Sequence, residues 1–365
     1  MTTHNHATET VSVQDLTMVY GKRTVLDIPS LKVNSGEVMG VIGPNGSGKT
    51  TLLLNLALLT VPTTGTVFYS DVPVTNPHQI LALRRKTATV FQEPLLLAMP
   101  VLENVTMGLK LRGVHGPQVK ERAKKWLARF GVAHLGNRSP RTLSGGEAKR
   151  VSLARAFSLE PEILFLDEPF TALDSPTRQA LLEDFDSVLR ETKVTTVMVT
   201  HDRNEALVVA GRVAVLIAGK LRQLGTPDEV FNYPVDEEVA GFVETGNILP
   251  GTVINQNQGL AVIRIGTREI EAVSKVPADK KVTVCLRHED VTLSLPAESA
   301  ETTSARNRFT GKITKIYPVG TQVRLTIDVG FPLVAMITRR SWEEMGLHQG
   351  STVVATFKAS AIHLI

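Results

Sequence analysis

A glycine-rich run, GPNGSGKTT at residues 43–51, constrains the fold of this chain more than any other feature. The apolar, strand-like segment VMGVIG leads into it, and the helical pattern TLLLNLALL follows it. Strand, glycine loop and helix in this order form the context of a phosphate-binding loop. Glycines let backbone N–H groups turn toward phosphates, and the helix presents its positive N-terminal end to the same anion. This order predicts an α/β nucleotide-binding fold.

Two side chains of the loop carry the expected chemistry. Lys49 is expected to reach the terminal phosphates of ATP, and the Thr50 hydroxyl is expected to ligate Mg²⁺. The alternative is a glycine-rich turn without a chemical role, which the order of strand, loop and helix argues against. The residues assigned to ATP binding here are Gly43, Pro44, Asn45, Gly46, Ser47, Gly48, Lys49, Thr50 and Thr51.

Two further strand-like runs end in candidate catalytic residues. ILFLDEP at residues 163–169 is apolar until it ends in two acids, and buried acids need a reason. Asp167 is expected to hold Mg²⁺ through water, and Glu168 to polarise the attacking water as a general base. TTVMVTHD then places His201 33 positions after Glu168, where it is expected to contact the γ-phosphate. A lone histidine after a strand is otherwise more often a packed residue.

The motif LSGGE at residues 143–147 lies between the phosphate loop and the Asp-Glu strand, and with it the chain resembles the ABC transporter ATPases. The resemblance implies that Ser144, Gly145 and Gly146 contact ATP held by the other subunit of a homodimer. It also implies that Tyr20 stacks on adenine, that Gln92 in VFQEP senses Mg²⁺ and the γ-phosphate, and that Asp174 in TALD links the two sites across the dimer.

Two positions depart from the commonest form of that pattern. Glu147 stands where Gln is usual, and Thr171 stands where Ser is usual. Neither change removes a group that contacts phosphate, so ATP hydrolysis remains the expectation.

The periodicity of the chain predicts two domains. Residues 1–10 form a polar tail, and residues 11–243 form a P-loop NTPase domain of the ABC ATPase type, with a helical subdomain at about 95–160. Residues 246–365 carry short β-type runs, typical of a small all-β, OB-like barrel of the TOBE/Mop kind. This part contains a faint repeat: LPGTVI recurs as FTGKIT, and LRHEDVTL recurs as FKASAIHL.

The second copy of the repeat resembles the Mop-type molybdate/tungstate-binding domain, in SARNRFTGKI, ITRRSWEEMGLHQG and FKASAIHLI. A tetrahedral dianion favours hydroxyl donors, backbone N–H groups and one or two cations. In that family the sites form between paired modules, which implies a site completed by the dimer. The alternative is that these hydroxyls cap backbone groups and the cations face water. The oxyanion contacts implied are Ser304, Arg306, Thr338, Ser341, Lys358 and Ser360.

Composition excludes several classes of protein. No run approaches the ~20 apolar residues of a membrane-spanning helix, and the first residues lack the apolar core of a secretory signal. The single cysteine, Cys285, fits a reducing compartment. The net charge of +4 comes without a basic run interleaved with aromatics, so nucleic acid is not an expected partner.

The function expected is therefore ATP hydrolysis by the peripheral subunit of an importer at the cytoplasmic face of the cell (inner) membrane. Its cofactors are ATP and Mg²⁺, and its cargo is an oxyanion, tungstate or molybdate. The partners implied are integral membrane permease subunits, docked on the apolar segment after Gln92, and an extracytoplasmic solute-binding protein. Alternatives are a sulfate, iron, polyamine or sugar importer, or a soluble regulatory ABC ATPase.

Overall fold

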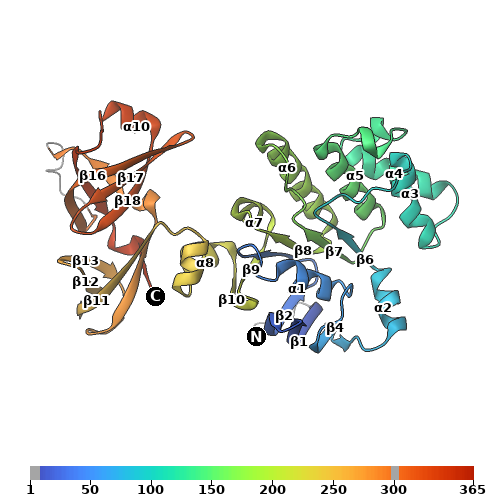
Figure 1. Ribbon diagram of the computed structural model, residues 1–365, viewed down its shortest axis with the longest axis horizontal. Coiled ribbons are helices and arrows are strands. Elements are labelled where there is room, and N and C mark those ends of the chain that lie inside the picture. The colour runs from blue at the N-terminus through green and yellow to red at the C-terminus, as the bar shows by residue number, and fades with distance from the viewer. Residues whose placement is uncertain (1–8, 297–303) are drawn as a thin grey trace, which may run out of the picture. The chain divides into compact units, whose positions relative to one another are not determined.

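The computed structural model describes residues 9–296 and 304–365 and separates into two compact units, the first ending at Pro227 and the second running over Asp228–Ile365 (Figure 1). Of the tail expected at residues 1–10, residues 1–8 lie outside the described part. The last two, Glu9 and Thr10, begin the first strand, β1 (Glu9–Tyr20).

The units divide some 16 residues before the expected boundary because two short helices, α8 (Pro227–Asn232) and α9 (Glu237–Phe242), pack on the second unit. Thr283 donates a hydrogen bond to Glu237 of α9. The ring of His363 bonds to the Pro234 carbonyl at 2.9 Å.

A six-stranded sheet in the order β10-β9-β3-β8-β7-β6 is the centre of the first unit. Its strands are parallel except β10, which is antiparallel to β9. Strand β7 is buried along its whole length, and its alternate side chains, Leu164 and Phe165 for example, enter separate hydrophobic clusters. The strands are β3 (Val38–Ile42), β6 (Thr87–Val90), β7 (Ile163–Asp167), β8 (Thr195–Thr200), β9 (Arg212–Ile217) and β10 (Lys220–Gly225).

Helix α1 and an antiparallel sheet cover one side of the central sheet, and the longer helices cover the other (Figure 1). The antiparallel sheet has the order β2-β1-β4-β5, with β2 (Arg23–Asn34), β4 (Thr64–Tyr69) and β5 (Val72–Pro73). The helices are α1 (Lys49–Leu56), α2 (Pro77–Arg84), α3 (Val101–Leu111), α4 (Pro117–Arg129), α5 (Gly145–Ser158), α6 (Ser175–Thr192) and α7 (Arg203–Val209).

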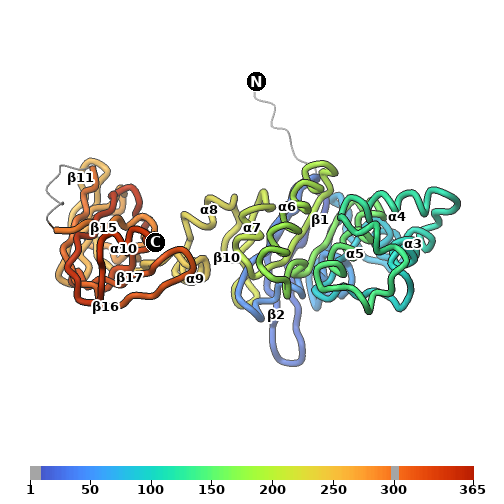
Figure 2. The backbone as a smooth tube through the Cα atoms, turned by 90° about the horizontal axis from the view of Figure 1, so that it is seen from above, coloured from blue at the N-terminus to red at the C-terminus, as the bar shows by residue number. Residues whose placement is uncertain are grey.

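Helices α3, α4 and α5 gather at one end of this unit, as Figure 2 shows. Aromatic rings join α4 to α5: Trp126 stacks on Phe157 at 5.1 Å, and Phe130, just after α4, lies 5.6 Å from Phe157, measured between ring centroids. These rings belong to one hydrophobic core with residues of β6 and β7, so the helical layer is packed on the central sheet. The layer corresponds to the helical subdomain expected at about 95–160.

The second unit is all-β apart from short helices, as its sequence predicted, and consists of two five-stranded antiparallel sheets. One sheet has the order β13-β12-β11-β14-β20 and the other β15-β19-β16-β17-β18. The first repeat supplies β11 (Asn247–Asn257), β12 (Leu260–Ile265), β13 (Arg268–Val273), β14 (Lys281–Leu286) and β15 (Thr292–Ser294). The second repeat supplies β16 (Asn307–Val319), β17 (Gln322–Asp328), β18 (Pro332–Thr338), α10 (Arg339–Glu344), β19 (Thr352–Phe357) and β20 (Ile362–Leu364).

The structure confirms the repeat and adds an exchange of strands between its halves. Strand β15 leaves the first half to pair with β19 of the second, and β20 leaves the second half to pair with β14 of the first. The two sheets share one hydrophobic core.

Two buried asparagines at the starts of the long strands repeat the same symmetry. Asn247 accepts from the Val334 N–H at 2.6 Å and donates to the Val334 carbonyl at 2.9 Å, both on β18. Asn307 makes the matching pair of bonds to Glu271 on β13, at 2.7 and 2.8 Å.

Candidate functional site

The glycine loop follows β3, and its tight path depends on two glycines. A Cβ on Gly43 would lie 2.0 Å from the Leu216 carbonyl oxygen. Gly48 has φ +99°, and a Cβ there would meet the Leu26 side chain at 2.7 Å and the Val25 carbonyl at 2.8 Å. Only glycine fits at both positions, and the loop therefore exposes its backbone N–H groups at the start of α1.

Lys49 and Ser47 are the buried polar side chains of the loop. The Lys49 ammonium donates to the carbonyls of Gly43 and Pro44 at 3.0 and 3.1 Å, and burial lowers its pKa. The Ser47 hydroxyl is buried with no hydrogen-bond partner in the described part of the chain. A buried cation satisfied only by loop carbonyls is suited to exchange them for phosphate oxygens.

Two of the three residues expected to hold Mg²⁺, Thr50 and Asp167, lie side by side. Thr50, at the start of α1, donates through its hydroxyl to Asp167 Oδ1 at 3.0 Å. Burial at the end of β7 raises the pKa of Asp167, which the bond from Thr50 partly offsets. A hydroxyl and a carboxylate this close are hard oxygen ligands of the kind Mg²⁺ prefers, so these residues fit the ion.

Glu168 is held in an unusual backbone conformation beside His201. Its φ is +46°, a left-handed value uncommon outside glycine, and its N–H donates to the Val199 carbonyl of β8 at 2.9 Å. One carboxylate oxygen lies 3.1 Å from His201 Nδ1, and the other accepts from the Thr171 hydroxyl at 3.2 Å. The strained turn thus aims the carboxylate along the mouth of the sheet, between two hydrogen-bonding neighbours.

A cavity of about 380 Å³ opens over the loop. Tyr20 lies at its edge with half of its side chain exposed, as a ring placed to stack on a ligand would be. Arg23 and Val25, which the sequence analysis did not select, line the cavity too, because the β1–β2 turn carries them past the loop. The remaining lining residues are Asn45, Gly46, Gly48, Lys49, Thr50, Thr51 and Glu168.

The signature residues start α5. Ser144 is its N-cap and forms a capping box with Glu147, whose carboxylate accepts from the Ser144 N–H at 2.7 Å. These hydrogen bonds lower the pKa of Glu147 and explain how Glu replaces Gln here. Ser144 and Gly145 are exposed, and among the described residues the lining of the cavity includes neither them nor Gly146.

Asp174 and Gln92 lie on other loops of the same unit. Asp174 is the exposed N-cap of α6 and accepts from the Thr177 N–H at 3.0 Å. The Gln92 side chain is exposed, whereas its carbonyl accepts a hydrogen bond from Lys149. Neither residue is among the described residues that line the cavity.

Glu205 is a buried acid that sequence reasoning missed. Only 3% exposed, it accepts from the Thr200 hydroxyl at 2.5 Å, and that hydroxyl accepts from the Asp202 N–H at 3.0 Å. Burial raises the pKa of Glu205 to about 7. This network fixes the turn that carries His201, and only the spacing of an acid four residues after the histidine could have indicated it.

The six candidate oxyanion ligands fall into two groups. Ser304, Arg306, Lys358 and Ser360 flank the paired residues Asn307 and Phe357 at the start of β16, and Arg306 forms an ion pair with Glu271 at 3.1 Å. Thr338 and Ser341 lie near the other end of β16. Val319, the last residue of β16, pairs with Gln322 of β17, and Gln322 pairs with Thr338 of β18. Thr338 caps α10 and lies 2.8 Å from the Ser341 hydroxyl. The register thus separates the two groups within one chain.

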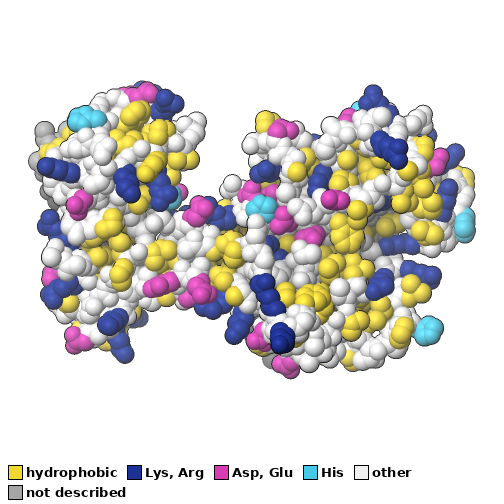
Figure 3. Space-filling view, in the orientation of Figure 1, with side chains coloured by type: hydrophobic (Ala, Val, Ile, Leu, Met, Phe, Trp, Pro, Cys, Tyr) yellow, Lys and Arg dark blue, Asp and Glu magenta, His cyan; other side chains and the backbone are white. Residues whose placement is uncertain are grey.

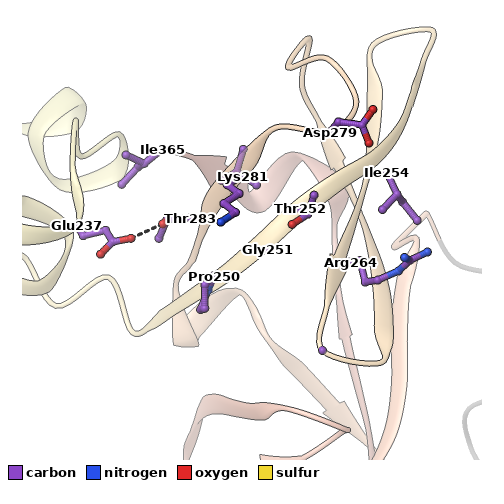
Figure 4. Close-up of a pocket in the computed structure, with 12 residues that line it drawn as sticks. Glu237, Pro250, Gly251, Thr252, Ile254, Arg264, Asp279, Lys281, Thr283 and Ile365 are labelled. Atoms are coloured by element: carbon purple, nitrogen blue, oxygen red, sulfur yellow. Dashed lines mark hydrogen bonds between the residues drawn. The ribbon is translucent and has the colours of Figure 1, made fainter.

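A larger cavity, of about 770 Å³, lies elsewhere in the second unit, between β11, β14 and the C-terminal residue (Figure 4). Lys281 and Arg264 approach it with Asp279 and Glu237, so its charges are balanced. Among the described residues that line it, none is an oxyanion candidate.

Two features are absent from the described residues. No helix there is long and apolar enough to cross a membrane. No group of three or more His, Cys, Asp or Glu side chains there is arranged to hold a metal ion.

Comparisons with known proteins agree with this geometry. A family model described as ABC transporter matches residues 26–171, and one described as TOBE domain matches residues 303–364. The molybdate/tungstate import ATP-binding protein WtpC of Pyrococcus horikoshii is 37% identical over 338 residues, which are 92% of this chain and 94% of that protein. The sulfate/thiosulfate import ATP-binding protein CysA of Nitrosomonas europaea is 34% identical over 94% of each chain.

A solved structure resembles the first unit. The ATP-binding cassette MJ0796, in a dimeric post-hydrolysis state bound to ADP and Pi, has a TM-score of 0.55 and 30% identity. The match covers 60% of this chain and 98% of that chain.

Proposed function

Because this chain belongs to the ABC transporter family, as the ATP-hydrolysing subunit of an importer, we propose that its transporter takes up an oxyanion, molybdate or tungstate. The observation that carries the proposal is the full-length likeness to WtpC, which extends beyond the ATPase unit into the duplicated β unit. The residues of the second repeat that resemble a Mop-type module supply independent support.

The chemistry proposed for the ATP site follows from the contacts around the loop. Lys49 exchanges its carbonyl partners for phosphate oxygens, and Glu168, held between His201 and Thr171, accepts the proton of the attacking water. Thr50 and Asp167 would hold Mg²⁺, with Gln92 as a further ligand, and the ion would neutralise charge on the phosphates. Tyr20 stacks on the adenine.

A homodimer completes each site in this proposal. Ser144, Gly145 and Gly146, at the start of α5, are not among the described residues that line the cavity of their own chain, which supports a contact with ATP held by the partner subunit. Asp174 links the two sites across the dimer. The dimeric state of the MJ0796 cassette supports the same arrangement.

The permease docks, in this proposal, on the segment that follows Gln92. Leu95 and Leu97 are about half exposed, and the segment borders the helical layer. Figure 3 shows hydrophobic side chains gathered over the face of the first unit seen there, with Lys and Arg side chains beside them. Exposed leucines such as Leu95 and Leu97 favour an apolar partner. The chain would then lie at the cytoplasmic face of the membrane, and an extracytoplasmic binding protein would deliver the ion.

A second candidate cargo is sulfate, because the CysA relative is also similar over nearly the full chain. Equilibrium binding of tungstate, molybdate and sulfate to the purified full-length protein tests the choice. Binding of tungstate or molybdate that is lost in Arg306→Ala and Lys358→Ala supports the proposal. Binding of sulfate alone would instead identify sulfate as the cargo. If none of the three ions binds, uptake assays with the co-purified permease decide.

A further inference from the structure

Three side chains on one face of α5 hold the segment that begins at Gln92. Lys149 donates to the Gln92 carbonyl. Ser152 donates to the Pro94 carbonyl at 3.4 Å, and Arg155 donates to the Pro94 and Leu95 carbonyls at 2.9 and 2.8 Å. Positions three apart in a helix share a face, so the three donors form one row, which we call the α5 clamp.

Lys149 is the unusual member of the α5 clamp. Its side chain is 5% exposed, although lysine is almost never fully buried without a partner. Burial lowers its pKa, which the charges of Glu168, Glu205, Asp167 and Glu93 partly offset. The charges of these four acids act on the ammonium, and the Gln92 carbonyl is its hydrogen-bond acceptor.

The far end of the held segment is equally constrained. The buried side chain of Asn104 accepts from the Leu97 N–H at 2.7 Å and donates to the carbonyls of Leu97 and Met99 at 3.0 and 2.8 Å. Leu95 has φ +45° and turns outward between the two anchors. Segment 92–97 thus has a fixed shape: its backbone is bonded inward, Leu96 packs against the core, and Leu95 and Leu97 remain exposed.

The helix that carries the α5 clamp also carries the signature. Ser144 caps α5, and its capping box with Glu147 fixes the first turn. The rise from Gly145 to Lys149 is about 6 Å, so the start of the helix and the first donor of the clamp belong to one rigid piece.

We propose that Lys149 is a positioning residue, with Arg155 as a second anchor, that fastens segment 92–97 to the signature helix so that both move together. A displacement of α5 by nucleotide at Ser144 then carries Gln92 and the exposed leucines with it. The inference rests on the proposed roles of Ser144 and Gln92 and deepens them, since it names the side chains that join them.

Lys149→Met tests the proposal in the full-length protein, because Met keeps the length of the side chain without its donor or charge. Lys149 is not among the described residues that line the ATP cavity, so the KM for ATP should stay within about twofold of wild type. The kcat should fall about tenfold, and the Mg²⁺ concentration at half-maximal rate should rise, because Gln92 is displaced. Lys124→Met, an exposed lysine on α4, is the matched control.

Two results would overturn the proposal: a wild-type kcat in Lys149→Met, or a kcat that falls together with ATP affinity and thermal stability, which would make Lys149 merely structural. Hydrogen exchange over residues 92–99 tests the α5 clamp without reference to activity. Faster exchange there in both Lys149→Met and Arg155→Met supports it, and unchanged exchange contradicts it. A wild-type protein that hydrolyses no ATP would defeat the proposed function, and the exchange result would still decide the clamp.

Discussion

His201 Nδ1 lies 3.1 Å from one oxygen of Glu168, while the Thr171 hydroxyl bonds to the other oxygen at 3.2 Å. The carboxylate is thereby held on both sides at the end of β7. A general base works only when its lone pair faces the proton that it removes, so the proposed role of Glu168 depends on its orientation as well as its presence.

Glu168→Gln should keep ATP binding and lose about 10²-fold or more in kcat, because an amide cannot accept the proton of water. ATP should then hold the variant as a closed dimer, seen by light scattering with and without MgATP. Glu183→Gln, an exposed acid on α6, is the control and should behave as wild type. Rapid hydrolysis by Glu168→Gln would remove Glu168 from the role of base.

His201 and Thr171, the two hydrogen-bonding neighbours of Glu168, should contribute unequally to kcat. His201→Ala removes a side chain that is expected to contact the γ-phosphate as well as Glu168, so kcat should fall by about 10²-fold. Thr171→Val removes one hydroxyl at similar volume and should lower kcat by less than about fivefold. Steady-state rates at saturating MgATP measure both. Equal losses in the two variants would show that His201 acts only by orienting the carboxylate.

Glu205 should make stability depend on pH. Its pKa is raised by burial from 4.5 to about 7, so the folded state holds the proton more tightly than the unfolded state does. Its contribution is therefore fully present below about pH 4.5 and is lost as the pH rises to about 7, by on the order of 3 kcal/mol.

Glu205→Gln keeps an acceptor for Thr200 and cannot ionise. The stability of the variant should therefore fall less than that of the wild type as the pH rises. Thermal unfolding between pH 5 and pH 8 measures it, and the variant should have the higher Tm at pH 8. Identical pH profiles for the variant and the wild type would mean that Glu205 titrates alike in both states.

Two loop glycines offer a matched pair of substitutions. Gly46→Ala meets no atom within 4 Å but keeps φ +77°, so strain alone should destabilise it, by about 1 kcal/mol. Gly48→Ala adds collisions with Leu26 and Val25, worth about 1–3 kcal/mol more. Denaturant unfolding should rank Gly48→Ala as the less stable variant. The opposite order would mean that Leu26 and Val25 of β2 shift at little cost to make room for the added methyl group.

The buried asparagines of the second unit should matter equally. Asn247→Ala leaves the N–H and carbonyl of Val334 without their partner, and Asn307→Ala does the same to Glu271, so each should cost about 3 kcal/mol. Asn255→Ala, at an exposed position of β11, should change stability by less than about 0.5 kcal/mol. Denaturant unfolding followed by the fluorescence of Trp342 in the second unit measures the free energies of unfolding. Clearly different losses in Asn247→Ala and Asn307→Ala would contradict the prediction.

The ATPase unit was largely predictable, because its chemistry depends on contiguous motifs. Lys49, Thr50, Asp167 and Glu168 follow strands whose order along the chain fixes their meeting point. Lys149 was not predictable, since a lysine in a helix normally faces water and only tertiary packing buries it.

The second unit shows a different limit. Its duplication could be seen in the repeats around Gly251 and Gly311, which are local. Pairing of the three-residue strands β15 and β20 with the opposite half could not, because so short a strand has no pattern that selects its partner. The compact units also divide before the expected boundary, because α9 and the residues just before it, which resemble the end of the ATPase in sequence, bond to β14 and β20.

The exchanged strands make the two halves of the β unit inseparable. A fragment that ended before β16 would keep β15 without its partner β19 and would leave the outer edge of β14 open, and an isolated second half would have the complementary defect. Each could recover its missing pairing only by borrowing a strand from another molecule. The β unit can therefore be gained, lost or moved between proteins only as a whole, because each half supplies a strand to the other.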